Sequence, residues 1–263
     1  MRPNYFVSTG VALLAVAITA CSSDSTNPGA PGTVSLSFAT TGASTTSASV
    51  APSGVLALNT ADALVITKAE VVLARLELQR SGATCTSTES AGDDDKDEGS
   101  CAELELAPSL VSLSTTGGVT QALNSSIPSG TYTAFEAKIR AVEAKKAASK
   151  AFLAAHPEMV GASVRVEGTF NGKAFTYTGA PKAELEGLFN PPLVADAKGA
   201  NITINVDLTN WFRTSSGTLV DPATANAGGT NAALVSSNIA RSFKAFRDDD
   251  HDGHDDRDSG RDH

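Results

Sequence analysis

The stretch that decides the fold is ASVRVEGTFNGKAFTYT, residues 162–178. Apolar and polar side chains alternate through it on both sides of the dipeptide Asn171-Gly172. Alternation with a period of two places one face of a strand in a core and the other in water. An Asn-Gly pair accepts positive φ at both central positions of a type I′ turn, so the segment predicts a β-hairpin.

The same alternation extends outward along the chain. It appears in residues 34–38, in residues 202–208, and in residues 130–142, where a strand follows the turn Ile127-Pro128-Ser129-Gly130. Short alternating runs separated by Gly, Pro and Asn turns are typical of a β-sandwich. We therefore expect a mainly β fold, an antiparallel β-sandwich, in one domain over residues 33–247.

Two segments predict peripheral helices. Residues 143–156 are rich in Ala, Lys and Glu and stop before Pro157, and residues 232–246 follow a helix cap at Thr230 or Asn231. The second helix should pack against the sheet through one apolar stripe. The side chains that we expect in the core from this part of the chain are Val235, Ile239, Phe243 and Phe246, with Trp211 and Phe212 closing one end.

The N-terminus has the pattern of an export signal. Arg2 precedes an apolar run over residues 6–20, which is short for a membrane span. The run ends in Ile18-Thr19-Ala20-Cys21, which resembles the signal of bacterial lipoproteins, cut before a cysteine that then carries acyl chains. The alternative is an ordinary secretory signal with a coincidental cysteine.

This resemblance implies a signal peptide over residues 1–20, lipidation (palmitate-type acylation) of Cys21, and a flexible tether over residues 21–32. The protein would then be held in the cell envelope through its N-terminal lipid, with the membrane as its first partner. Ser22 after the cysteine favours the outer membrane in proteins with such a signal.

Two cysteines, Cys85 and Cys101, remain after such processing. Exported proteins mature under oxidising conditions, so we expect a disulfide between them. The pair flanks an acidic stretch and lies between two strand-like segments, VVLARLELQR before it and AELEL after it. The disulfide would pinch the base of a long loop between two strands; a thiol metal site is the alternative, although no histidine lies nearby.

Charge is unevenly distributed over the 263 residues, whose net charge is −9. Residues 89–98 carry a net charge of −5 and residues 248–263 a net charge of −6, which leaves +2 for the rest of the chain. With 41% hydrophobic residues the chain is too apolar to be disordered throughout. Its acidity argues against binding to nucleic acid.

The acidic C-terminal tail, residues 248–263, carries the sharpest chemical signal. Its first nine residues match D-x-D-x-D-G-x-x-D and resemble the calcium loops of thrombospondin type 3 and dockerin modules. Ser259 stands where a bidentate Glu would complete the loop. The candidate metal ligands are Asp248, Asp250, Asp252, His254 and Asp256. Weak Ca²⁺ binding, a transition metal held by His251 and His254 with the Asp residues, and a solvated tail without metal remain open.

Motifs for catalysis are few. The only histidine outside the tail is His156, and no nucleophile elbow, phosphate loop or dinucleotide fingerprint occurs. Two carboxylate pairs, Glu103/Glu105 and Glu184/Glu186, each share one face of a strand. Paired carboxylates could serve a glycosidase, but an exposed sheet face explains them as well.

Residues 63–142 resemble a family of exported bacterial lipoproteins of unknown function. The match lies in a strand-like V-x-L-x-R-L-E-L segment and in Ile127-Pro128-Ser129-Gly130-Thr131-Tyr132-Thr133. The later segment, from NWF at residues 210–212 through VDP at residues 220–222 to the acidic end, resembles other uncharacterised exported proteins. The resemblance implies a β-sandwich and carries no catalytic residues.

We therefore expect a non-enzymatic, lipid-anchored binding or structural module of the cell envelope, with Ca²⁺ as its one candidate cofactor. Its partner would be a protein or a polysaccharide, and not nucleic acid. The alternatives are an envelope glycan hydrolase that uses paired carboxylates and a metal-handling lipoprotein that uses the His/Asp tail.

Overall fold

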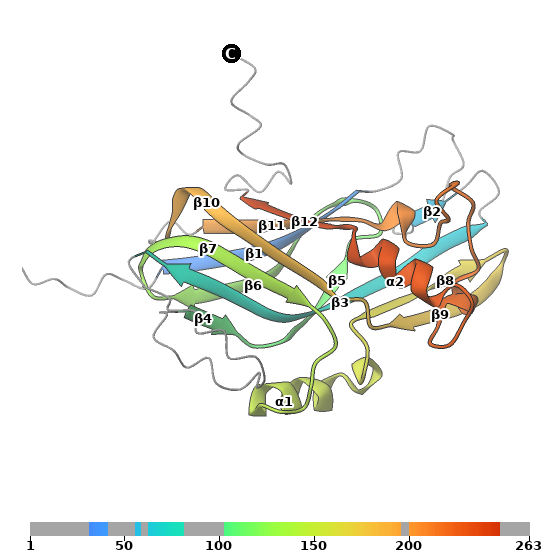
Figure 1. The fold of residues 1–263 in the computed structure, drawn as a ribbon, viewed down its shortest axis with the longest axis horizontal. Helices are drawn as coiled ribbons and strands as arrows, with labels where there is room; N and C mark the ends of the chain where they lie inside the picture. Colours follow the sequence, from blue (N-terminus) through green and yellow to red (C-terminus); the bar gives the residue numbers. More distant parts are fainter. Residues whose placement is uncertain (1–31, 42–55, 59–62, 82–102, 196–199, 248–263) are drawn as a thin grey trace, which may run out of the picture.

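The computed structural model describes residues 32–41, 56–58, 63–81, 103–195 and 200–247. They form two β-sheets whose apolar faces meet in one core (Figure 1). Alternate side chains of each sheet, such as Leu36 and Ile204 in one and Leu76 and Ile139 in the other, lie in that core with almost no exposed surface. The prediction of a mainly β, sandwich-like fold with two helices is confirmed.

The smaller sheet has the strand order β12-β11-β1-β6. Its strands are β1 (Gly32–Thr41), β6 (Gly118–Ile127), β11 (Ala200–Asp207) and β12 (Phe243–Arg247). β1 and β11 run parallel, and the other neighbours are antiparallel. The parallel pair joins the start of the domain to a segment far along the chain, which the alternation pattern did not indicate.

The larger sheet is built on one long strand, β3 (Leu64–Arg80), which contacts five others. Three short strands follow one edge of β3: β4 (Glu103–Leu106), β5 (Ser109–Leu113) and β2 (Leu56–Leu58). Beyond the other edge lie β7 (Gly130–Ile139), β8 (Val164–Phe170), β9 (Lys173–Gly179) and β10 (Ala183–Ala195).

β7 and β8 lie end to end beside β3. Residues 69–71 pair with both β5 and β8, so these two strands occupy opposite edges of β3. Leu73 pairs with both β5 and β7, which places β7 on the same edge as β8. β10 and β9 extend this arrangement by pairing with β7 and β8 respectively (Figure 1).

Between β7 and β8 the chain leaves the sheet and forms helix α1 (Ala147–Ala155) and the short 3₁₀ helix η1 (Pro157–Met159). This excursion covers the middle of the sheet's outer face. Val72 on that face packs with Phe152 and Met159 in a second, smaller core. The outer face is thereby divided, and no helix among the described residues covers the part over β10, β7, β3 and β4.

The remaining helices close the end of the sandwich near β8 and β9 (Figure 1). They are η2 (Leu208–Asn210), η3 (Pro222–Ala225) and α2 (Ala232–Ala240). Trp211 and Phe212 are fully buried as expected, and the ring of Phe212 lies edge-on to Tyr177, with 5.4 Å between centroids. Asn226 bonds the backbone of β9 at Thr176 and Thr178 and so pairs part of its free edge.

The predictions for single elements are confirmed in part. The hairpin at Asn171-Gly172 is confirmed, with φ of 49° and 76° at its two turn residues. The helix expected over 143–156 spans Ala147–Ala155. The helix expected over 232–246 is wrong in its last part: α2 ends at Ala240, and Phe243–Arg247 forms β12, because the edge of β11 supplies its backbone partners.

No helix in the described ranges has the length and hydrophobicity needed to cross a bilayer.

Candidate functional site

Four glutamates form a row across the open outer face of the larger sheet. Glu186 of β10 pairs in register with Glu136 of β7, Glu136 with Glu77 of β3, and Glu77 with Glu105 of β4. We call this row the glutamate ladder. Like charges directly opposite one another on neighbouring strands destabilise a sheet, so the ladder needs compensation.

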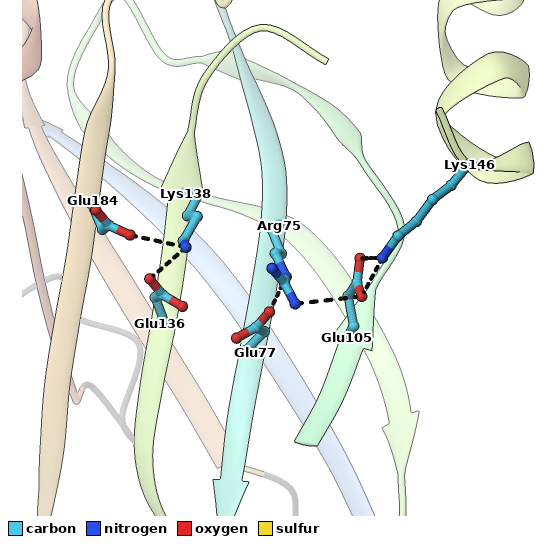
Figure 2. Close-up of polar contacts among 7 residues, drawn as sticks. All are labelled: Arg75, Glu77, Glu105, Glu136, Lys138, Lys146 and Glu184. Carbon is cyan, nitrogen blue, oxygen red and sulfur yellow. Dashed lines mark hydrogen bonds and ion pairs between the residues drawn. The ribbon is translucent and has the colours of Figure 1, made fainter. Parts of the chain in front are cut away.

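The adjacent row and Lys146, at the N-cap of α1, supply three cations (Figure 2). The Lys138 ammonium lies 2.9 Å from a Glu136 oxygen and 3.0 Å from one of Glu184, and the Arg75 guanidinium pairs with Glu77.

Glu105, at the far end of the ladder, is held from two directions. The Lys146 Nζ lies 2.9 Å from its Oε2, and the Arg75 guanidinium is 3.7 Å away. The compensation is therefore strongest at the β3 and β4 end, where Glu77 is also nearly buried.

The opposite end of the ladder is undercompensated. Glu186 is exposed and has no ion pair with another described residue. Carboxylate oxygens of Glu136, Glu184 and Glu186 all lie within 4.8 Å of one another. Lys138 is the one cation that forms ion pairs with these acids in the described part of the chain, so the group keeps an excess of negative charge.

The crowding changes the acidity of the group. Partial burial, and then the hydrogen bond with Glu184, raise the pKa of Glu136. The same hydrogen bond, with those of Lys138 and the charge of Arg140, lowers the pKa of Glu184. Burial alone would lower the pKa of Lys138, but its bonds to the two glutamates raise it. Glu136 therefore takes up a proton before Glu184 as the pH falls.

An open hollow of about 500 Å³ lies over this end of the ladder. Three ladder carboxylates line it, from Glu77, Glu136 and Glu186, together with the Leu188 side chain. Leu188 is 79% exposed, the highest value among the large apolar residues of the described ranges. The hollow thus combines negative charge with an apolar edge.

This arrangement can attract a positively charged group. Carboxylate oxygens are ligands for Ca²⁺, and they also pair with ammonium and guanidinium groups. Lys138 already occupies the space between two of the three acids, so a bare metal ion would have to displace or rearrange it. An incoming cation meets the least competition at Glu186.

The candidate residues identified from the sequence lie in different parts of the structure. Glu184 and Glu186 lie together at the ladder's open end, and Glu105 lies at its closed end. Glu103 lies in β4. His156 follows α1, where its ring lies 4.9 Å from that of Phe152 and its Nδ1 lies 3.5 Å from Glu158.

Other sequence-based candidates lie outside the described residues. These are Cys21, the cysteines Cys85 and Cys101, and the tail ligands Asp248, Asp250, Asp252, His254 and Asp256. Their lipidation, disulfide and metal binding remain predictions.

Sequence reasoning missed Arg75, Glu77, Glu136, Lys138 and Lys146. A signal was present, because R-x-E at 75–77 and E-x-K-x-R at 136–140 place opposite charges two residues apart on one strand face. The register between strands, which decides that the glutamates meet, is not written in either segment alone.

Comparison with known proteins adds no relative: no family model matches the chain, and neither a curated protein nor a solved structure does. The resemblance of residues 63–142 to exported lipoproteins therefore remains a prediction.

Proposed function

We propose that the protein is a lipid-anchored, exported binding module of the cell envelope that acts without covalent chemistry, and that the open end of the glutamate ladder holds a cationic group of its partner. The anchoring rests on the sequence Ile18-Thr19-Ala20-Cys21. The binding surface rests on one observation: the exposed Glu186 carboxylate lies within 4.8 Å of those of Glu136 and Glu184, beside an open hollow.

The binding part is tested with a short lysine peptide, tetralysine, as the probe. Calorimetric titration should show saturable, salt-sensitive binding, and Glu186→Gln should weaken it about fivefold, the effect of one exposed charge pair. Glu158→Gln is the matched control, since it removes one exposed carboxylate away from the ladder. Equal affinity of all three proteins, or no binding, would contradict the proposal.

The anchoring part has a separate test. Cys21→Ala should leave the chain unacylated and release it from the membrane fraction. If the variant is processed and retained as the wild type is, the lipid anchor is wrong, whatever the peptide titration gives.

A glycan hydrolase is the second candidate. It is favoured by the opposite pKa shifts of Glu136 and Glu184, the pattern of an acid and a base. Against it, the Lys138 ammonium lies within 3.0 Å of both carboxylates, in the space that a glycosidic oxygen would need. Hydrolysis of envelope glycans that disappears in Glu136→Gln would replace the binding proposal.

The acidic tail is a third, independent element of the proposal. Titration of Ca²⁺ and Zn²⁺ into the full chain and into a chain ending at residue 247 separates its three interpretations. Heat with Ca²⁺ alone supports the calcium loop, and heat with Zn²⁺ supports metal handling through the histidines. No heat with either ion on the full chain leaves the solvated tail.

A further inference from the structure

A second hollow lies on the same outer face, between the start of α1 and the strands β3, β4 and β7. Its volume is about 340 Å³, within the usual range of small-ligand sites. The charged side chains that line it are Arg75, Arg140, Lys145, Lys146, Glu105 and Glu143. We call it the basic hollow.

The lining of the basic hollow has a net charge of +2, because four cations face two carboxylates. This charge is opposite to that of the glutamate ladder beside it. Two of the four cations form ion pairs within the lining, since Lys145 lies 3.2 Å from Glu143 and Lys146 lies 2.9 Å from Glu105.

These two pairs leave Arg75 and Arg140, and Arg75 is itself paired with Glu77, so Arg140 is the cation without an ion pair among the described residues. It is partly buried, and within the described residues its guanidinium has no hydrogen bond or ion pair. A guanidinium presents several N–H donors in a planar fork that fits the oxygens of a phosphate or carboxylate. Arg140 lines the hollow together with three other cations, a setting in which an oxyanion is attracted and a further cation is repelled.

The backbone N–H groups at the start of α1 add partial positive charge beside the hollow. Ala148 and Ser149, in the first turn of α1, line it. Lys146 at the helix cap makes no side-chain capping bond, and the first turn contains no acidic residue. The helix end therefore adds to the positive potential that the four cationic side chains create.

We propose that the basic hollow is an anion site that binds a phosphate monoester, with the Arg140 guanidinium as its main contact. A phosphate monoester carries about −1.5 to −2 charges at neutral pH, which matches the charge of the lining, whereas a carboxylate supplies one charge only. The hollow is also large enough for more than the phosphoryl group. Glu105 of the ladder also lines this hollow, but the site does not depend on the cationic partner proposed for the open end of the ladder.

The test uses the full chain in a nonionic detergent, with inorganic phosphate and glycerol 3-phosphate as probes. Backbone amide shifts of Ala148 and Ser149 should move saturably with either probe. Arg140→Gln should weaken the binding about tenfold, the loss of one charge-assisted fork. Lys173→Gln, which removes one exposed cation at the β8–β9 hairpin, should leave it unchanged.

A variant that removes a negative charge from the lining should have the opposite effect. Glu143 is 65% exposed and pairs with Lys145, so Glu143→Gln should preserve the fold and strengthen phosphate binding. Lys145→Gln should weaken it, and serves in place of Arg140→Gln if that variant fails to fold. Absence of saturable shifts in the wild type, or equal affinity in the Arg140, Lys145 and Glu143 variants, would overturn the proposal.

A third probe, micelles containing phosphatidic acid, distinguishes a lipid headgroup from a soluble phosphate monoester as the ligand. Tighter binding to these micelles than to glycerol 3-phosphate, lost in Arg140→Gln, identifies a lipid headgroup as the ligand. Binding of the two soluble probes without any preference for the micelles identifies a soluble phosphate monoester. Both outcomes support the site, and they differ in what occupies it.

Discussion

Each sheet of the sandwich carries a polar row on the face that points away from the core, and the two rows differ in kind. On β1 and β11 the row is neutral and buried: the hydroxyls of Ser35 and Ser37 donate to Asn201 Oδ1 at 2.8 and 3.1 Å, and Asn201 Nδ2 donates to Thr203. On β10, β7, β3 and β4 the row is the glutamate ladder, which is charged and open to solvent at one end.

The comparison separates a polar sheet face that stabilises the fold from one that responds to salt, pH and cations. Neutral groups that satisfy one another do not depend on salt and do not need a counterion. Carboxylates held by too few cations respond to ionic strength, to pH and to any cation that arrives. A substitution in the neutral row should therefore affect folding, and one in the ladder should affect how the protein responds to its medium.

The largest effect is expected in the neutral row. Asn201→Ala should lower the free energy of unfolding by about 2 kcal/mol, because it leaves the buried hydroxyls of Ser35 and Ser37 without this acceptor. Denaturant unfolding measures the change. Asn205→Ala, on the same strand face but only partly buried, should cost much less. Equal losses in the two variants would remove the distinction between the rows.

A smaller effect, dependent on salt, is expected in the ladder. Lys138→Gln removes the cation shared by Glu136 and Glu184 and should cost about 1 kcal/mol at low ionic strength. The loss should shrink at high salt, since the remaining repulsion is screened. Unfolding midpoints in a salt series measure it, with Lys173→Gln as the control. A loss that stays constant with salt would mean that Lys138 acts through packing.

The smallest effect is expected from Glu136, and it depends on pH. The pKa of Glu136 is raised in the fold, so the protonated side chain stabilises the folded state. This contribution to the free energy of unfolding is complete below the ordinary glutamate pKa and is lost as the pH rises through the raised pKa. Glu136→Gln avoids this loss. It should therefore be a few tenths of a kcal/mol more stable than the wild type at neutral pH, and no more stable in acid. Unfolding at both pH values checks the sign, and a gain confined to acid would contradict it.

The parts of the fold that sequence predicted are those set by neighbouring residues. Asn171-Gly172 determines its hairpin locally, and alternation assigned the core faces of β1 and β11. The end of α2 could not be read in this way. Four residues after Ile239, Phe243 would extend the apolar stripe of a continuing helix, and it is equally suited to the buried position beside Val206 that it takes in the strand. The backbone partners on β11 decide in favour of the strand.

The candidate site was only partly predictable for a related reason. Glu184 and Glu186 were identified as a pair on one strand face, which is a local property. That Glu136 lies opposite Glu186 follows from the pairing of β10 with β7, which is interrupted between Leu188 and Leu193. The parallel contact of β1 with β11 likewise depends on the whole topology.

The end-to-end placement of β7 and β8 makes the segment between them a natural site for insertion. Their facing ends pair with Leu73 and Val71 of β3, two residues apart on one strand, so the chain returns close to where it left. The turn at Val160 and Gly161 is exposed, and Gly161 has open space around its Cα. A fluorescent or affinity domain placed at this turn should leave all the sheet pairings intact, so that binding at the ladder can be followed in living cells without altering the surface under study.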